Sequence, residues 1–190
     1  MRAFAATVVV ILLVTGVSLI GYARWTGTLE RADAAVADGR YEQAAAAYQT
    51  AEARFDAVPA MKQFLQIEHT RAIGNHLLAL YRLQRYDEVI ELAQKAPAPA
   101  QPNFWSACAF FQKAIVEESP EARLGWLSRA EEEFRKAIEA SPEDWDTKFD
   151  YELTTRLASE LRRQPNTPPK QMMQLLRPPT AGAKPPRRTG

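Results

Sequence analysis

The sequence predicts an all-α protein in which an N-terminal transmembrane helix precedes irregular helical hairpins. A run of 21 uncharged residues occupies positions 3–23, and the remainder is dominated by the helix formers Ala, Leu, Glu, Gln and Arg. Glycine is scarce, with 8 in 190 residues, and no stretch alternates as a half-buried strand does. We therefore divide the chain into a membrane anchor (1–25), a helical domain (26–163) and a Pro-rich basic tail (164–190).

The uncharged run is long enough to cross a bilayer. At ~1.5 Å per residue it forms a helix of roughly 31 Å, against a hydrocarbon core of ~30 Å. Tyr22 and Trp25 follow at its end, where amphipathic aromatics favour the headgroup layer. Two alternatives stay open: a buried core helix, and a cleaved signal peptide with the small residues Gly21 and Ala23 before the cut, although its apolar run is normally shorter.

The orientation in the membrane is indicated only by the position of the span. Arg2 precedes it, and Arg24 and Arg31 come after it, so the basic residues barely discriminate. A single short span at the N-terminus usually leads to export of the C-terminal part of the chain. We therefore expect a single-pass protein of the bacterial inner membrane with its C-terminal domain in the periplasm.

The charge distribution limits the classes of partner that the protein is expected to bind. Residues 24–163 hold 23 acidic and 18 basic side chains, whereas residues 164–190 hold five basic side chains and no acidic one. A mildly acidic body is not typical of a nucleic-acid binder, so we expect no nucleic-acid partner.

Cys108 is the only cysteine, which excludes an intrachain disulfide. It is expected to be a small buried thiol, with a reactive or intermolecular thiol as the alternative.

Turn signals divide the body into helices. Residues 37–40 and the Pro-rich residues 96–102 interrupt stretches of helical periodicity. Ser119-Pro120 and Ser141-Pro142 each read as a capping serine followed by proline at the first helical position, so both are predicted to open helices.

One residue pattern recurs between these turns. A small residue is followed four positions later by an aromatic and three positions after that by a second small residue, as in Ala44, Tyr48 and Ala51. Small residues let a neighbouring helix approach closely, and the aromatic fills the groove beside it. The pattern is found, with variations, in residues 38–51, 83–96 and 130–142.

These segments resemble the second helix of the tetratricopeptide repeat (TPR). In the third segment four signature positions match: Ala130, Phe134, Ala137 and Pro142. In the second segment, Val89 and Ala93 replace the usual small and aromatic residues. The turns at Tyr41 and Tyr86 lie 45 residues apart rather than the usual ~34. The resemblance implies irregular TPR-like hairpins with a long middle helix.

Residues 141–156 narrow the resemblance. They are similar to the closing helix of bacterial membrane-anchored TPR proteins that accompany MoxR-type ATPases and von Willebrand A-domain proteins, and among these to the MxaK family of methanol-oxidation accessory proteins. This resemblance implies a role in maturation of a periplasmic methanol dehydrogenase, including its calcium supply. The implied partners are the dehydrogenase or the MoxR and von Willebrand A-type proteins. The alternative is a structural scaffold in another envelope complex, for secretion or the cell wall.

No catalytic or cofactor motif accompanies this layout. His69 and His76, the only histidines, lie seven residues apart, about 10.5 Å along a helix, too far to share a metal ion. The acidic residues 143–152 lack the glycine turn of a calcium loop, and Glu143 and Asp144 are expected in the first helical turn. We therefore expect no enzyme, no metal site and no cofactor.

The candidate residues for partner binding fall into three groups. Trp105 and Trp126 are expected to pack in the core or between hairpins, or else to lie on a concave docking surface formed by the first helix of each pair. The basic end of the last helix is the second group. The third is an apolar island in the tail, which either docks on this body or a partner or is an idle linker. The members of the last two groups are Arg156, Arg162, Arg163, Met172, Met173, Leu175 and Leu176.

Overall fold

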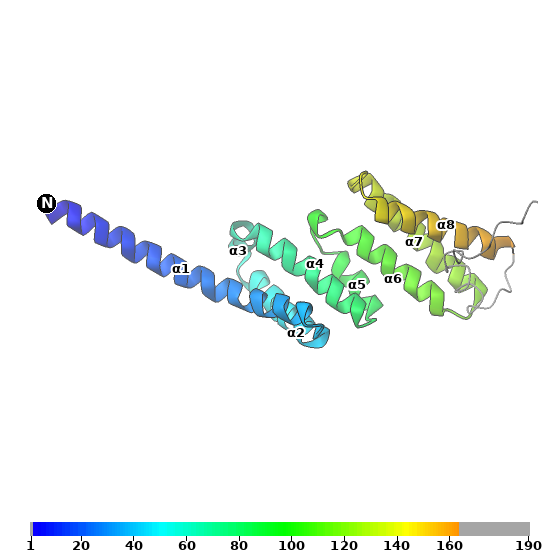
Figure 1. Ribbon diagram of the computed structural model, residues 1–190, viewed down its shortest axis with the longest axis horizontal. Helices are drawn as coiled ribbons and strands as arrows, with labels where there is room; N and C mark the ends of the chain where they lie inside the picture. The colour runs from blue at the N-terminus through cyan, green and yellow to red at the C-terminus, as the bar shows by residue number, and fades with distance from the viewer. Residues whose placement is uncertain (1, 164–190) are drawn as a thin grey trace, which may run out of the picture. The chain divides into compact units, whose positions relative to one another are not determined.

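The computed structural model describes residues 2–163, without the side chains of residues 2–10 and Val14. All described residues form helices or the short connections between them, which confirms the all-α class (Figure 1). The elements are α1 (Arg2–Ala37), α2 (Tyr41–Ala57), α3 (Pro59–Phe64), α4 (Gln66–Arg82), α5 (Tyr86–Ala93), the 3-10 helix η1 (Ala98–Ala100), α6 (Pro102–Val116), α7 (Pro120–Ala140) and α8 (Trp145–Arg163).

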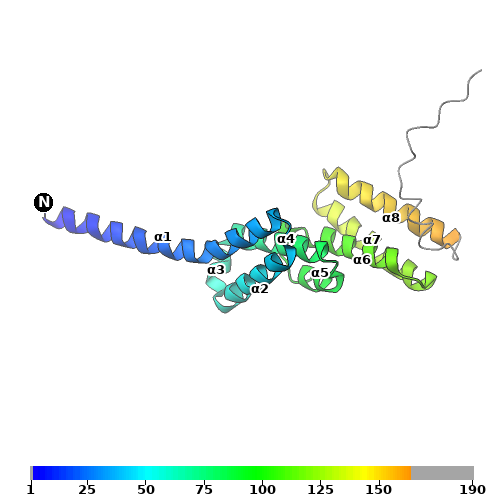
Figure 2. The same ribbon diagram turned by 60° about the horizontal axis from the view of Figure 1, so that its bottom comes forward.

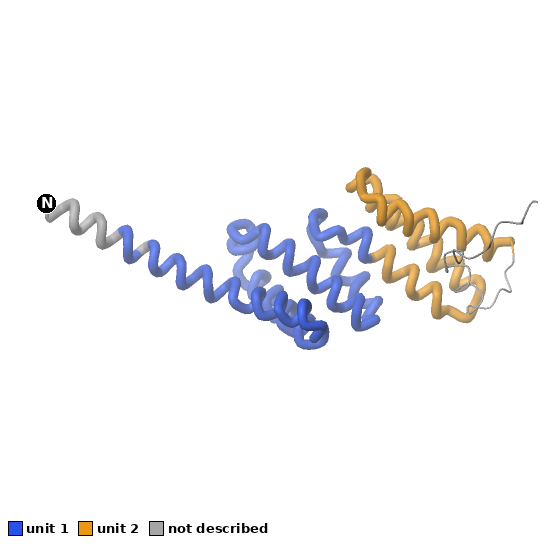
Figure 3. The backbone as a smooth tube through the Cα atoms, in the orientation of Figure 1, with its two compact units in different colours: residues 1–105 blue, residues 106–190 orange. Residues whose placement is uncertain are grey.

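The chain divides into two compact units, a division that the sequence analysis does not draw. Unit 1 is Met1–Trp105 and unit 2 is Ser106–Gly190, shown in different colours in Figure 3. The boundary falls within α6. Each unit has buried apolar residues of its own.

Unit 1 consists of two helical hairpins and the short α3. The C-terminal part of α1 packs on α2, α2 packs on α4, and α4 packs on α5 (Figure 2). Ala44, Tyr48 and Ala51 are all buried on α2, as the repeated pattern predicts. Val89 and Ala93 are buried at the corresponding positions of α5. The small residues therefore allow the close approach that their spacing indicates.

The two hairpins of unit 1 share one turn geometry. Gly39 has φ +73° and Gln84 has φ +60°, and in each turn the next residue donates its N–H to a carbonyl five residues earlier. These bonds join Arg40 to Ala35 at 2.8 Å and Arg85 to Leu80 at 3.0 Å. Both turns are thus Schellman-type helix ends with a left-handed residue. The segments that begin at residues 38 and 83 are therefore alike in the backbone conformation of their turns as well as in sequence pattern.

The expected long middle helix is wrong. Val58, with φ −133° and ψ 78°, separates α2 from α3, and Leu65, with ψ 43°, separates α3 from α4. Val58 precedes Pro59, whose ring disfavours the helical conformation of the residue before it. The interval of 45 residues between the turns at Tyr41 and Tyr86 exceeds the usual ~34 residues, and the short separate helix α3 lies within this interval.

Unit 2 has a core between α7, α8 and the end of α6. Ala114, Leu127, Leu157 and Leu161 form one buried cluster. The predicted start of α7 is confirmed: the Ser119 hydroxyl accepts the backbone N–H of Ala122 at 3.3 Å, and Pro120 is the first helical residue. Ala130, Phe134 and Ala137 are buried on α7, as the third repeat segment predicts.

The predicted start of the last helix at Ser141-Pro142 is wrong. Ser141 is the C-terminal cap of α7, and α8 begins three residues later than expected, at Trp145. The Asp144 carboxylate accepts the backbone N–H groups of Asp146 (3.1 Å) and Thr147 (3.2 Å) and the Thr147 hydroxyl (2.7 Å). A carboxylate that accepts three hydrogen bonds at the positive end of a helix caps it more strongly than the Ser141 hydroxyl would.

The membrane-spanning part of the fold prediction stays a prediction. Within the described residues, no helix is both long and apolar enough to traverse a bilayer. The side chains of residues 3–10 and Val14, within the expected span 3–23, lie outside the described set.

Candidate functional site

A groove of about 540 Å³ lies in unit 1. One wall is a stripe of α4 running from Gln66 to Leu78, at positions that lie on one face of a helix. The other wall consists of residues 99–101 and Trp105, at the start of α6. The groove therefore lies along the first helix of the second hairpin.

A glycine opens the middle of the α4 wall. A Cβ atom added to Gly74 would meet no heavy atom within 4 Å, so the space above it is free. Leu78 lies one turn further along the same stripe. Glycine in a helix interior costs roughly 1 kcal/mol relative to alanine. Gly74 is one of the residues that line the groove.

Trp105 is both a packing residue and a wall of the groove. It is half-buried, with its ring centroid 5.8 Å from that of Tyr81 on α4 and 5.4 Å from that of Phe104. It therefore packs against neighbouring aromatic rings and also lines the groove. The contact with Tyr81 fixes the ring that a ligand would meet.

Two polar side chains of the wall, Asn75 and Arg71, are held by Asp33 from α1. Asn75 donates to the Asp33 carboxylate at 2.9 Å, and the Arg71 guanidinium lies 3.2 Å from it. The buried Tyr48 hydroxyl of α2 donates to the same carboxylate. Three helices thus contribute to one hydrogen-bonded cluster, the Asp33 cluster, formed by Asp33, Tyr48, Arg71 and Asn75.

Electrostatics make the groove close to neutral. Burial, reinforced by the hydrogen bond to Asp33, raises the pKa of Tyr48 well above its usual value, so the phenol stays a donor. The charge of Arg71 is offset by Asp33. A phosphate site would present uncompensated cations. The lining of Ile67, Leu78 and Trp105 with a few amides suits a peptide segment better.

The two histidines lie beside the groove wall and have separate partners. His76 is buried and hydrogen-bonded to Glu52 at 2.7 Å, and His69 packs edge-on against Phe55 with centroids 4.8 Å apart. Each histidine is therefore engaged in contacts within unit 1. Within residues 2–163, side chains outside the description excepted, no group of three or more His, Cys, Asp or Glu residues is placed to hold a metal ion.

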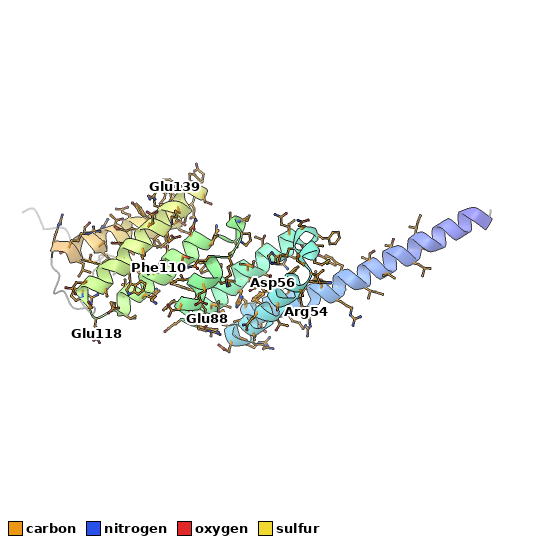
Figure 4. All side chains as sticks on the ribbon, turned by 180° about the vertical axis from the view of Figure 1, so that it is seen from behind. Arg54, Asp56, Glu88, Phe110, Glu118 and Glu139 are labelled. Atoms are coloured by element: carbon orange, nitrogen blue, oxygen red, sulfur yellow. The ribbon has the colours of Figure 1, made fainter. Side chains whose placement is uncertain are left out.

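Trp126 belongs to a stacked cluster in unit 2. Its ring lies 5.9 Å from Phe110, which is labelled in Figure 4, with an interplanar angle of 17°. Lys113 and Arg129 approach the ring to 4.4 and 4.9 Å, and its N–H donates to Glu117 at 3.3 Å. These cation–π and stacking contacts hold Trp126 within the α6–α7 hairpin.

The other predicted binding residues are not gathered into one site. Arg156 pairs with Glu152 at 2.8 Å, Arg162 lies 3.6 Å from Glu131, and Arg163 is exposed at the end of α8. The tail residues lie outside the described part of the chain: Met172, Met173, Leu175 and Leu176.

Cys108 has the properties of an unreactive thiol. It is half-buried on α6, and burial, with a smaller contribution from the nearby Asp150 carboxylate, raises its pKa to about 12. At neutral pH almost none of it is thiolate, which is the nucleophilic form. The expectation of a buried structural cysteine agrees with this environment.

The residues predicted from the sequence do not include Gly74, Asp33 or Asn75, on which the groove depends. A glycine in the middle of a strong helical pattern was one available signal, since it lowers helix propensity and often has a packing or functional reason. No comparable signal identified Asp33, because its partners lie 15 to 42 residues away in the chain.

Comparison with known proteins identifies no relative. No family model, no curated protein and no solved structure matches this chain. The fold defines a protein of packed helical hairpins, and the TPR and MxaK resemblances remain predictions from the residues.

Proposed function

We propose that this protein is a membrane-anchored, TPR-like scaffold without catalytic activity, which binds a peptide segment of another envelope protein in the groove of unit 1. The observation that carries the proposal is the groove itself. It combines a free space over Gly74, an apolar wall at Leu78 and Trp105, and hydrogen-bonding groups held in place by Asp33.

The pre-organised polar groups favour peptide binding over nonspecific contact. Asn75 and Arg71 are already oriented by the Asp33 carboxylate, so little side-chain entropy is lost when a ligand arrives. An extended segment offers backbone N–H and C=O groups to such side chains and places apolar side chains in the groove. Concave surfaces formed by successive first helices are the usual binding faces of stacked hairpins.

The proposed anchor is the segment 3–23 at the start of α1. It contains no charged residue. Its described apolar side chains stand largely in the open: Ile11 is 58% exposed, Leu12 65% and Val17 70%. Figure 1 shows this part of α1 extending alone, beyond the other helices of unit 1. A row of exposed aliphatic side chains of this length is costly in water and favourable in lipid.

The client that we propose is a periplasmic methanol dehydrogenase or one of its maturation proteins, with the dehydrogenase's assembly and calcium supply as the process assisted. This part rests on the resemblance of residues 141–156. Unit 2 adds no described metal cluster of its own, so a role in calcium supply would consist of holding other components together.

Replacing the groove glycine tests the binding surface. Gly74→Leu places a side chain in the free space and raises helix propensity, so the melting temperature is expected to stay equal or rise. Gly125→Leu is the matched control, since an added Cβ at this α7 glycine also meets nothing within 4 Å. Full-length wild-type and variant proteins are cross-linked in native membranes, purified in detergent and compared by mass spectrometry.

The expected result is a cross-linked protein that wild type and Gly125→Leu capture and Gly74→Leu does not. Identical capture by all three would overturn the groove as the binding site. A captured methanol dehydrogenase or MoxR-type partner supports the maturation role, whereas a secretion or cell-wall protein would contradict it.

A further inference from the structure

We infer that a small apolar surface around α3 lies against the lipid headgroup region, so that the body of unit 1 contacts the membrane directly. The surface, the α3 patch, consists of Val58, Phe64 and Ile67. The inference rests on the proposed anchor and adds a second, peripheral membrane contact to it.

The α3 patch is exposed to a degree that the packing of unit 1 does not account for. Phe64 is 77% exposed, Ile67 80% and Val58 44%. None of the residues of α3 is buried. Large apolar side chains that cluster on the surface mark interaction sites more often than isolated ones do.

Two contacts place this surface beside the end of the proposed span. The Tyr22 hydroxyl of α1 donates to Glu68 at the start of α4, at 3.1 Å. The Trp25 ring lies 5.3 Å from Phe55 at the end of α2. Figures 1 and 2 both show α3 next to the point where α1 leaves the other helices. The patch therefore lies at the level of Tyr22 and Trp25, the residues expected at the membrane interface.

The chemistry of the patch fits the interface rather than the bilayer core. Lys62 lies within α3 and pairs with Asp56, so polar and charged groups stay beside the aromatic and aliphatic side chains. Phe and Ile side chains gain from burial at the boundary of headgroups and acyl chains, while lysine reaches back toward water. Figure 4 labels Asp56 and Arg54 on the same end of α2.

Continuity with the anchor identifies lipid as the occupant. Leu19, Ile20 and Tyr22 are exposed on α1, and the hydrogen bond from Tyr22 to Glu68 brings the α3 patch alongside them. Once residues 3–23 are inserted, the bilayer surface is necessarily within reach of side chains at the depth of Tyr22. A protein partner would have to displace that surface.

Site-specific photo-crosslinking in the full-length protein tests the inference. The amino acid p-benzoylphenylalanine replaces Phe64 or Ile67, and in further variants Val17 within the anchor and Gln94 at the exposed end of α5. All four positions are exposed, so folding is expected to be retained. The proteins are reconstituted in vesicles of phosphatidylethanolamine and phosphatidylglycerol, irradiated, and analysed by mass spectrometry for phospholipid adducts.

We expect phospholipid adducts at positions 17, 64 and 67, at least several-fold above those at position 94. Adducts at position 17 with none above control at 64 and 67 would overturn the patch and leave the anchor in place. Absence of adducts at position 17, with release of the protein by salt alone, would overturn the anchor and the patch together. In native membranes, adducts of position 64, which lies outside the groove lining, with a protein in place of lipid would assign the patch to a partner and contradict the inference.

Discussion

At the scale of single residues, the Asp33 cluster connects the fold to the groove. Asp33 is partly exposed, with 29% of its side chain accessible, yet it holds side chains from α2 and α4. Hydrogen bonds that involve a charged partner are stronger than neutral ones. The same contacts therefore stabilise the packing of three helices and orient the polar wall of the groove.

The contribution of this cluster is measurable with Tyr48→Phe. The substitution removes one donor to the Asp33 carboxylate and keeps the buried ring, so unfolding in urea should show a loss of about 1–2 kcal/mol. Tyr41→Phe, at the start of α2, is the control and should change stability by less than about 0.5 kcal/mol. Equal effects of the two substitutions would mean that the cluster adds nothing to stability.

His69 should make stability depend on pH. Burial, and secondly the charge of Lys62, lower its pKa, while Glu52 and Asp56 act in the opposite direction. The unfolded chain, with a pKa near ~6.5, then binds the proton more readily than the native state, so stability falls as pH decreases through this range. Between about pH 7.5 and about pH 5.5, the urea midpoint of wild type should drop more than that of His69→Phe. Parallel slopes would contradict this assignment.

At the scale of elements, the two similar turns of unit 1 differ in the conformational free energy of the residue with positive φ. Gly39 adopts a positive φ without strain, whereas Gln84 adopts nearly the same conformation with a side chain. A left-handed conformation costs a non-glycine residue roughly 1–2 kcal/mol, partly offset by the greater flexibility of glycine in the unfolded state.

The two turns therefore predict opposite effects of opposite substitutions. Gln84→Gly should stabilise the protein by about 0.5 kcal/mol, and Gly39→Ala should destabilise it by about 1 kcal/mol. Thermal unfolding of both variants beside wild type tests the pair. A destabilised Gln84→Gly protein would show that the Gln84 side chain makes a compensating contribution.

Arg123 connects α6 to α7 through the end of a helix. It is only 1% exposed, and its guanidinium donates to the carbonyl oxygen of Glu117 at 2.7 and 3.0 Å and to that of Glu118 at 3.3 Å. Arg123→Met leaves these carbonyls without that donor and should cost about 2–3 kcal/mol in urea unfolding. Arg135→Met, which breaks exposed pairs on the same helix, should cost less than about 0.5 kcal/mol.

At the scale of the whole molecule, each unit has its own buried residues. Leu127→Ala removes a fully buried side chain from the cluster of unit 2 and should cost about 2–5 kcal/mol. In stacked-hairpin proteins each hairpin contributes its own stability and interacts chiefly with its neighbours. Relative to wild type, hydrogen exchange in the Leu127→Ala variant should therefore accelerate more in residues 107–163 than in α2 and α4. Uniform acceleration would show that the chain opens as one cooperative body.

The sequence predicted local features well and features that join distant segments poorly. The buried pattern of Ala44 and Tyr48 and the cap at Ser119 depend on neighbours within one helix or turn, and both are confirmed. The start of α8 was misplaced because two capping residues, Ser141 and Asp144, compete within four positions. The break at Val58 had a local signal in Pro59 that the sequence analysis did not use.

Helix propensity and periodicity were enough to predict an all-α chain of hairpins, because these depend on interactions within a few residues. The groove and its Asp33 cluster became visible when α1, α2 and α4 packed together. Their contacts join Asp33 to Asn75 across 42 positions, and no short-range pattern encodes which helix faces meet at such a separation. Long-range packing, rather than composition, placed a free space over Gly74 beside Trp105.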